Sequence, residues 1–324
     1  MAELTMVAAL NAALRDALSS DPRTLVLGED VGRLGGVFRV TDGLQREFGP
    51  ERVFDTPIAE AGIVGAAVGL CLAGWRPIVE IQFEGFSYPA LDQVISHVAK
   101  YRYRTRGRVD LPLVIRMPFG GGIRGKEHHG ESPETYYVHT AGLKVVVPST
   151  AADAYRLLRA AIADPDPVVF LEPKARYWAK EEGTLTTEGP GIGEAVVVRD
   201  GGACTIVSYG AMVHRCLEAA ARLEERGIGC RVLDLRSLVP LDLAAHRDAV
   251  RRTGRVVVVH EAPRTLGMGA EIAARVMELA FDHLESPVAR VTGYDTPYPP
   301  ASLEDRWLPS VERIVAAVER TVGY

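Results

Sequence analysis

The residue types most able to move protons gather in two short segments. Glu60 follows Thr56 and Pro57 at the start of a run of small apolar residues, and His128 and His129 share a glycine-rich, charged loop. A carboxylate at the mouth of a closely packed apolar helix is poorly solvated, so we expect a raised pKa that suits proton sharing with a basic nitrogen. A histidine suits acid–base work or phosphate recognition. The structural alternatives are a carboxylate that complements a helix dipole and two surface histidines.

Metal ligands do not accompany these groups in the sequence. Neither histidine has further ligands at a usual metal spacing. The four cysteines are scattered, without a CxxC pair, and predict reduced structural thiols: Cys71, Cys204, Cys216 and Cys230. His260, followed by Glu261 at the end of an apolar run, is the next candidate for chemistry.

Alternating strands and helices must position these groups. Runs rich in β-branched residues predict strands at 24–27, 77–83, 113–117, 144–147, 168–172, 195–199, 205–209, 229–235, 255–260 and 288–292. Helical patterns occupy 7–18, 58–73, 90–104, 150–163, 211–226, 242–251, 268–281 and 310–321. Several strands are apolar throughout, which is typical of strands buried on both faces of a parallel sheet. The alternation predicts an α/β fold with right-handed crossovers.

One polar, turn-forming stretch at 178–194 interrupts this rhythm and predicts a domain linker. The expected organisation is a first domain at 1–180, a linker at 181–194 and a second domain at 195–324.

Composition excludes several classes of protein. A net charge of −5 and a pI near 6.0 offer no basic face for nucleic acid. The densest basic run, at 100–108, indicates a cationic helix end or a subunit contact rather than an RNA site. The acidic, amphipathic start is not a signal peptide, and no apolar run reaches about 18 residues, so we expect a cytoplasmic protein without a membrane span. Asparagine occurs once, at Asn11, which is typical of thermally adapted, thermophilic compositions.

Three glycine-rich runs invite a nucleotide-binding interpretation: 28–36, 120–125 and 267–271. None has the dinucleotide-binding spacing or the Walker ending. A nucleotide-dependent oxidoreductase that is complete in one chain is therefore the weaker alternative from a different class.

A set of motifs in chain order resembles one known family. The motifs are LGEDVG (27–32), GVFRVT (36–41), DTPIAEAG (55–62), EIQFEGF (80–86), LDQ (91–93), HGESPE (129–134) and VVFLEPK (168–174). They resemble the β subunit of the thiamine-diphosphate-dependent 2-oxoacid dehydrogenase component, a family that includes pyruvate and branched-chain enzymes. The resemblance covers essentially all 324 positions.

The resemblance implies a transketolase-like pyrimidine-binding domain with a mainly parallel sheet, followed by a transketolase C-terminal α/β domain. It implies an α2β2 heterotetramer with an α subunit, and thiamine diphosphate at the α/β interface. Glu60 matches the catalytic glutamate that hydrogen-bonds the aminopyrimidine ring. The other cofactor-binding matches are Glu29, a second acidic position, and the pyrimidine pocket residues Ile58, Gln82 and Phe86, of which Phe86 is expected to stack on the ring.

His129 matches the active-site histidine that assists reductive acylation of a lipoyl group. A further match is a monovalent-cation loop for K⁺, made of Leu113, Ala161, Ile162, Asp164 and Asp166. Turn-forming aspartates beside two prolines are the structural alternative there.

Family members hold the diphosphate through Mg²⁺ with a GDG run and a later pair of asparagines. This chain has no GDG, and its one asparagine is Asn11. We therefore expect the α subunit to hold Mg²⁺ and the diphosphate, which excludes a single-chain transketolase.

The expected reaction is oxidative decarboxylation of a branched-chain 2-oxoacid of the 2-oxoisovalerate type, with acyl transfer to a lipoyl domain. The EPK run at 172–174 with the later Tyr177 favours the branched-chain enzyme. A pyruvate dehydrogenase β subunit and a non-catalytic scaffold subunit are the alternatives. In the second domain, Glu312, Glu319 and the Tyr324 carboxylate are candidates for docking the subunit-binding domain of a dihydrolipoyl acyltransferase, or form a solvated helix face.

Overall fold

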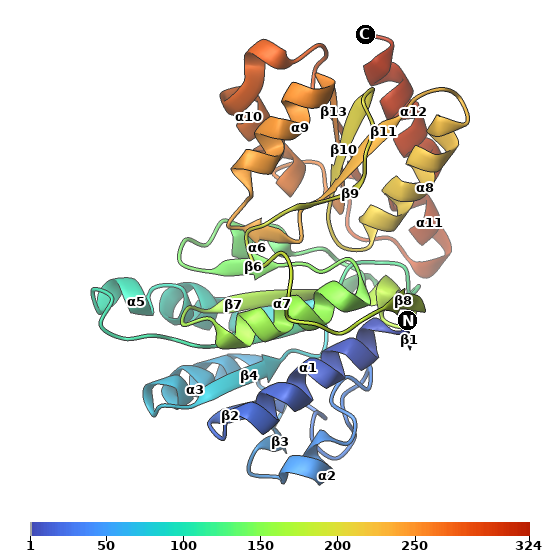
Figure 1. Ribbon diagram of the computed structural model, residues 1–324. Helices are drawn as coiled ribbons and strands as arrows, with labels where there is room; N and C mark the ends of the chain where they lie inside the picture. Colours follow the sequence, from blue (N-terminus) through green and yellow to red (C-terminus); the bar gives the residue numbers. More distant parts are fainter. Residues whose placement is uncertain (1) are drawn as a thin grey trace.

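The computed structural model describes residues 2–324 and contains two α/β units, one stacked on the other (Figure 1). The first unit is built on a seven-stranded sheet in the order β12-β6-β7-β5-β4-β2-β3. All its neighbouring strands pair in parallel except β12, which pairs antiparallel with β6. The bounds are β2 (Thr24–Gly28), β3 (Val53–Asp55), β4 (Arg76–Glu80), β5 (Val114–Phe119), β6 (Lys144–Val146), β7 (Val168–Pro173) and β12 (Ser237–Val239).

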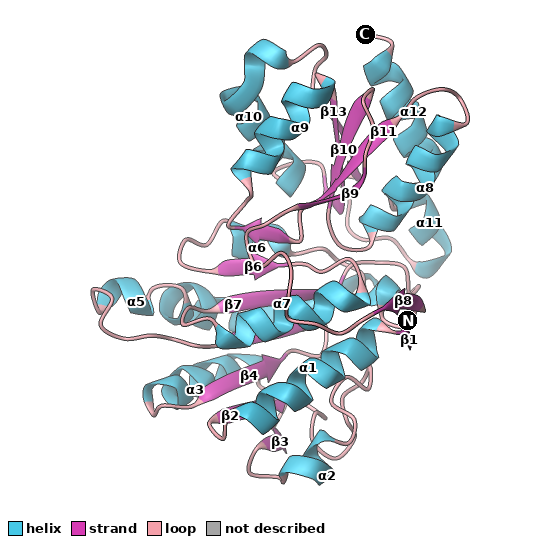
Figure 2. Ribbon diagram, viewed as in Figure 1, coloured by secondary structure: helices cyan, strands magenta, loops and turns pink. Residues whose placement is uncertain are grey.

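Helices cover both faces of this sheet (Figure 2). On one face lie α1 (Met6–Ser20) and α7 (Ala151–Ala163), and on the other lies α3 (Glu60–Leu72). Successive residues of β5 point to opposite faces: Val114 packs with α1 and α7, and Ile115 packs with α3. Burial on both faces explains why these strands are apolar throughout, as the sequence predicted.

The second unit has a five-stranded sheet in the order β14-β13-β10-β11-β9, in which only β9 runs antiparallel to its neighbour. Its strands are β9 (Val196–Arg199), β10 (Cys204–Ser208), β11 (Cys230–Asp234), β13 (Val256–Pro263) and β14 (Ala289–Gly293). The helices α9 (Leu243–Thr253) and α10 (Met268–Ala280) cover one face, and α8 (Met212–Glu224) and α12 (Val311–Val322) cover the other.

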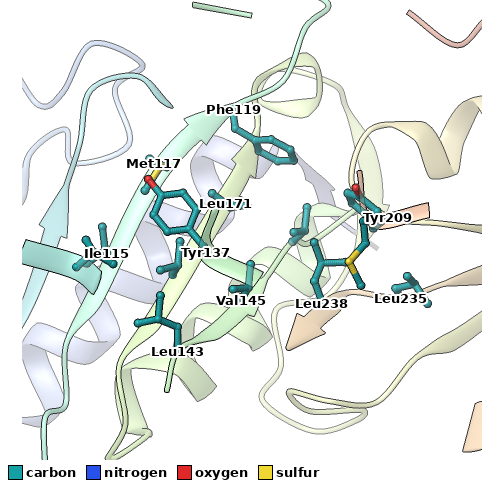
Figure 3. Packing of buried hydrophobic residues seen from close by; sticks show 14 of the residues in the cluster. Ile115, Met117, Phe119, Tyr137, Leu143, Val145, Leu171, Tyr209, Leu235 and Leu238 are labelled. Carbon is teal, nitrogen blue, oxygen red and sulfur yellow. The ribbon is translucent and has the colours of Figure 1, made fainter. Parts of the chain in front are cut away.

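The two units share one hydrophobic core. Tyr209 and Leu235 of the second unit pack in the same cluster as Phe119 and Val145 of the first, together with Leu238 of β12 (Figure 3). Strand β12 also belongs to the first sheet although it follows β11 along the chain. The sequence missed this strand because its partner β6 lies far away in the sequence, and three residues carry no period.

The helix predicted at 90–104 is broken. It consists of α4 (Leu91–Gln93), the π-helical segment η2 (Val94–Val98) and α5 (Tyr101–Arg104). The Ala99 amide donates to the Val94 carbonyl at 2.9 Å, one residue beyond the α-helical spacing. The predicted strand at 77–83 is likewise too long, because β4 ends at Glu80 and the 3₁₀ segment η1 (Glu84–Ala90) follows.

Short elements escaped the sequence patterns. They are β1 (Ala2–Leu4), α2 (Leu44–Phe48), β3 of the first sheet, α6 (Glu134–Val138), β8 (Glu181–Gly183) and α11 (Glu304–Trp307). Strand β8 lies in the predicted linker and pairs antiparallel with β1. Among residues 2–324, no helix has both the length and the apolar character that crossing a bilayer requires.

Candidate active site

The carboxyl ends of β2, β3, β4 and β5 lie at one edge of the first sheet, because these strands are parallel. Glu29, Glu60 and Gln82 follow three of these ends. Ligands of open α/β sheets bind at such an edge. Glu60 is the first residue of α3 and is only 9% exposed. The helix begins there rather than at 58, so Pro57 precedes the helix.

Two carboxylates lie close together at this edge. Glu29 is buried, and its Oε1 has no hydrogen-bond partner among the described residues. Burial raises the pKa of Glu29, and the nearby charges of Glu60 and Asp30 raise it further. The Gln82 amide donates to Asp30 Oδ2 at 2.8 Å, which fixes Gln82 beside the acids. The arrangement makes Glu29 easier to protonate than a solvated glutamate.

A glycine allows β2, which Glu29 follows, to approach β4 closely. A Cβ on Gly28 would lie 2.5 Å from the Glu80 carbonyl oxygen, and the Gly28 φ is +158°. The Gly28 carbonyl accepts from the Thr56 amide at 2.9 Å, which draws the segment before α3 towards the end of β2. Any larger residue at Gly28 would clash with β4 and displace the end of β2 that precedes Glu29.

His129 lies in an aromatic cluster. Its ring stacks on Phe83, with 4.0 Å between centroids and 26° between planes, and meets Phe86 edge-on at 5.3 Å. Its Nδ1 is buried without a hydrogen-bond partner among residues 2–324. Burial and the adjacent His128 lower the pKa of His129, so the imidazole is neutral at neutral pH. The half-buried Phe86 therefore faces His129.

Beside the acids, the first unit exposes apolar surface. Ile58 is 84% exposed, and α3 turns Gly62, Ala66 and Gly69 to the outside. These small residues line a groove of about 590 Å³. A helix that is apolar on all sides belongs in an interior, so this face requires a covering surface.

Buried ion pairs support the sheet beneath the site. Arg116, 1% exposed, donates two bonds to Glu172, both at 2.8 Å, and one to Glu80. The Tyr177 hydroxyl donates to Glu172 at 2.5 Å. Sequence reasoning gave Arg116 no role, although an arginine inside an apolar strand signals a buried partner.

A second buried pair joins η1 to the end of β7. The Lys174 Nζ lies 2.5 Å from Glu84 Oε2, and both side chains are fully buried. Burial raises the pKa of Glu84 to about 7 and lowers the pKa of Lys174. The Lys174 ammonium is also 5.5 Å from the centroid of the Phe83 ring, so it supports the ring on which His129 stacks.

Comparison with known proteins identifies the family. Residues 2–179 match the family described as transketolase, pyrimidine binding domain, and residues 193–314 match transketolase, C-terminal domain. The chain is 56% identical over 320 residues to the 3-methyl-2-oxobutanoate dehydrogenase subunit beta of Mycobacterium tuberculosis, covering 98% of this chain and 92% of that one. It is 53% identical over 322 residues to the pyruvate dehydrogenase E1 component subunit beta of Leifsonia xyli, covering 99% and 95%.

The chain belongs to the family of 2-oxoacid dehydrogenase E1 β subunits. A solved structure titled "Split gene transketolase, inactive beta4 tetramer" has a TM-score of 0.81 and 26% identity, covering 99% of this chain and 98% of that one. The resemblance and the transketolase-like fold predicted from the sequence are therefore confirmed.

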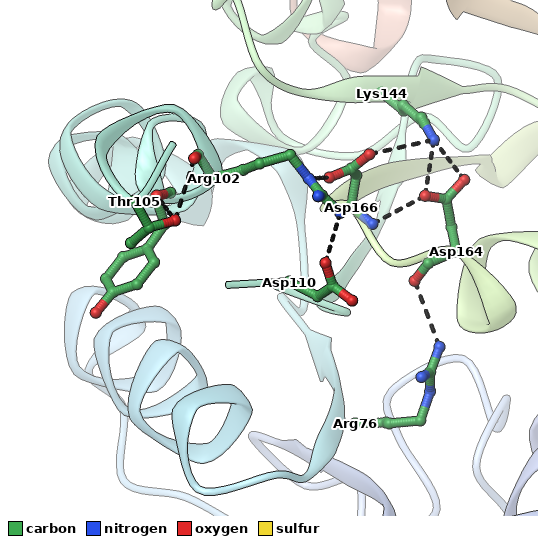
Figure 4. A network of polar contacts seen from close by, with 8 residues as sticks. Arg76, Arg102, Thr105, Asp110, Lys144, Asp164 and Asp166 are labelled. Atoms are coloured by element: carbon green, nitrogen blue, oxygen red, sulfur yellow. Dashed lines mark hydrogen bonds and ion pairs between the residues drawn. The ribbon is translucent and has the colours of Figure 1, made fainter. Parts of the chain in front are cut away.

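The predicted cation loop of this β subunit lies at the opposite, amino-terminal edge of the sheet, where cationic side chains contact its oxygens (Figure 4). The Lys144 Nζ contacts both Asp164 carboxylate oxygens, at 2.7 and 2.6 Å, and Arg102 pairs with Asp166. The Ile162 carbonyl accepts from Arg76 at 2.7 Å.

The two remaining predicted ligands are also engaged. The Leu113 carbonyl accepts the Val168 amide at 2.9 Å, and the Ala161 carbonyl accepts the Asp164 amide at 3.3 Å. As arranged here, these five residues do not fit a potassium ion. Potassium binding at this loop stays a prediction, and the ion would have to displace Lys144.

The remaining candidates have structural roles. His260 Nε2 accepts from the Gly269 amide at 3.0 Å near the start of α10, and burial lowers the His260 pKa to about 3. Asn11 donates to the backbone carbonyls of Val40 and Asp42, at 2.7 and 3.1 Å. The four cysteines are buried and free. Within residues 2–324, no cluster of His, Cys, Asp and Glu side chains forms a metal site.

The acidic residues of α12 in this β subunit are already paired. Glu312 accepts from Arg222 at 2.9 Å, and Glu319 accepts from Arg226 at 2.5 Å. Tyr324 is exposed. Docking of an acyltransferase on this face stays a prediction.

Proposed function

We propose that this β subunit, paired with an α subunit, performs thiamine-diphosphate-dependent oxidative decarboxylation of a 2-oxoacid and passes the acyl group to a lipoyl domain. The observation that carries the proposal is the pair of buried carboxylates, Glu29 and Glu60, beside an uncovered apolar helix. The buried carboxylates support proton chemistry at this edge of the sheet, and the uncovered helix beside them supports the binding of a partner there.

The residues present fit the aminopyrimidine half of the cofactor. Glu60, Glu29 and Gln82 supply hydrogen-bonding groups, and Glu29 Oε1, which has no partner within residues 2–324, is open to a bond from a ligand. Ile58 and Phe86 supply apolar walls. The chain lacks the GDG run and asparagine pair, so the α subunit would hold Mg²⁺ and the diphosphate. When bound, thiamine diphosphate supplies a nucleophilic carbon for the keto group of the substrate.

The protein side chains would divide the proton work. Glu60 would share a proton between its carboxylate and a ring nitrogen of the bound cofactor. Glu29, whose pKa burial raises, accepts or returns a proton beside Glu60. The neutral His129 imidazole has one donor and one acceptor nitrogen, which suits it to orient an incoming lipoyl group through a hydrogen bond.

The α3 face supports pairing with the α subunit in an α2β2 assembly. Gly62, Ala66 and Gly69 permit close approach of another helix, and Ile58 projects from the same edge. The relatives compared above are themselves named as β subunits or E1 component subunits.

For the substrate we propose a branched-chain 2-oxoacid of the 2-oxoisovalerate type, with pyruvate as the alternative. The support is the similarity to the M. tuberculosis relative, which only narrowly exceeds that to the L. xyli relative. The EPK run no longer separates the two, because Glu172 and Lys174 form buried ion pairs. The ratio of kcat/KM for 2-oxoisovalerate to kcat/KM for pyruvate in the reconstituted enzyme tests this choice of substrate. A large preference for pyruvate would overturn it.

Glu60→Gln in the reconstituted heterotetramer tests the catalytic role. We expect decarboxylation to fall on the order of 10²-fold, the usual scale for a positioned acid–base group. Glu278→Gln, the same chemical change on an exposed side chain, is the matched control. Unchanged decarboxylation in Glu60→Gln would favour the alternative of a non-catalytic scaffold subunit. Binding of NAD to the isolated chain, measured by calorimetry, would favour the alternative of a nucleotide-dependent oxidoreductase.

A further inference from the structure

The loop that carries His129 is bonded to the second unit. This segment, residues 120–133 and here named the His129 loop, connects β5 to α6. The Gly121 amide donates to Glu261 Oε2 at 2.8 Å, and the Arg124 amide donates to both carboxylate oxygens of Glu304, at 3.2 and 3.1 Å. Glu261 lies in β13 and Glu304 begins α11, so both acceptors come from the second unit.

Both acceptor carboxylates are shielded from solvent. Glu261 is 6% exposed and Glu304 is 1% exposed. The buried Tyr298 hydroxyl donates to Glu304 Oε1 at 2.7 Å, which holds that carboxylate in place. Hydrogen bonds from backbone amides to buried carboxylates are stronger than those between neutral groups, because the charge is poorly screened.

Close packing seats the His129 loop between the two units. A Cβ on Gly130 would lie 2.3 Å from a ring carbon of Tyr298, in the second unit. On the other side, a Cβ on Gly85 would lie 2.2 Å from the His128 carbonyl oxygen. The loop closes on itself through the Gly120 amide, which donates to the Glu131 carbonyl at 2.9 Å.

The imidazole of His129 itself lacks such anchoring. It stacks on Phe83, and its Nδ1 has no hydrogen-bond partner among the described residues. Stacking limits the tilt of the ring, but neither Phe83 nor Phe86 offers a polar atom that would fix its rotation. The position of the ring therefore depends on the backbone of the His129 loop.

We propose that Glu304 and Glu261 are positioning residues, by which the second unit holds the His129 loop and so sets the place of the His129 imidazole. The catalytic consequence rests on the proposed function, whereas the anchoring does not. The second unit then takes part in acyl transfer although neither carboxylate touches the reacting groups.

The test uses the reconstituted heterotetramer with Glu304→Ala, Glu304→Gln and Tyr298→Phe. The matched control is Asp305→Asn, because the Asp305 side chain is 69% exposed and accepts from the exposed side chain of Arg124 rather than from its amide. Amide hydrogen exchange of peptides covering 120–133 reads the anchoring directly. We expect exchange to rise at least ~10-fold in Glu304→Ala, less in the other two, and not in Asp305→Asn.

Two partial reactions read the consequence. We expect reductive acylation of a free lipoyl domain to fall ~10-fold in Glu304→Ala, with partial recovery in Glu304→Gln, which keeps one acceptor oxygen. Decarboxylation measured with an artificial electron acceptor should stay at the wild-type rate, since Glu60 and Glu29 lie at other strand ends.

Each outcome is decisive. Unchanged exchange in Glu304→Ala refutes the anchoring, and raised exchange with unchanged acylation refutes the positioning of His129. Equal losses in both partial reactions indicate general damage and also refute it. If Glu304→Ala does not fold, Tyr298→Phe removes only a hydroxyl and must show the same exchange and acylation pattern. A wild-type enzyme without acylation activity overturns the proposed function but leaves the exchange result standing.

Discussion

Glu134 gives this β subunit a stability that should fall as the pH rises. It is the first residue of α6, fully buried, and accepts a 2.5 Å hydrogen bond from the Tyr209 hydroxyl of the second unit. Its Oε2 has no partner among the described residues. Burial raises the pKa of Glu134 from 4.5 to about 7.

The magnitude follows from that pKa. At about 1.36 kcal/mol per pH unit, the difference between 4.5 and about 7 corresponds to about 3 kcal/mol of unfolding free energy. Because the folded pKa is the higher one, this stability is fully present below about pH 4.5 and is lost as the pH rises through about 7. Glu134→Gln mimics the protonated acid and cannot ionise, so the variant should match the wild type at pH 5 and exceed its stability at pH 8.

Thermal unfolding between pH 5 and 9 measures the effect. An unfolding entropy of about 2.1 cal/mol/K per residue gives about 0.7 kcal/mol/K for 324 residues, so about 3 kcal/mol moves the midpoint by about 4–5 °C. Glu278→Gln on the surface controls for the loss of one charge. Parallel pH profiles for Glu134→Gln and the wild type would refute the reasoning.

Two further substitutions test the charged networks. Arg116→Met leaves the buried Glu80 and Glu172 carboxylates without their cation. Denaturant titration should therefore show that the free energy of unfolding falls by about 3–5 kcal/mol at pH 8, and by less at pH 5, where the acids can take up protons. A fall below about 1 kcal/mol at both pH values would contradict this. The thermal stability of the wild type should be equal in K⁺ and Na⁺, because Lys144 already contacts Asp164. Lys144→Met frees the Asp164 carboxylate, so the thermal stability of this variant should depend on K⁺. A wild type that is stabilised by K⁺ and not by Na⁺ would show that the ion displaces Lys144.

The sequence predicted the strands of the two sheets well, because burial on both faces demands unbroken apolar runs such as that of β13. It failed at the three-residue strands β3 and β12, the second of which depends on distant pairing, and at 90–104, where the π-helical segment η2 leaves the apolar spacing almost unchanged. Glu60 and His129 could be selected from residue type and context.

The supporting charges could not be derived in the same way. Arg116 and Lys174 find their acids on neighbouring strands and on η1, so their roles depend on the arrangement in space. The same holds for Glu304, which reaches the Arg124 amide across 180 positions of the chain.

The place of β12 in the first sheet has a consequence for biosynthesis. Once the ribosome has synthesised β2 to β7, the nascent chain contains every parallel strand of the first sheet. The outer edge of β6 still exposes unpaired backbone amides and carbonyls. That edge is covered only when Ser237–Val239 has left the ribosome. We therefore expect the first unit to finish folding late in translation, and a chain truncated within 181–194 to aggregate through β6.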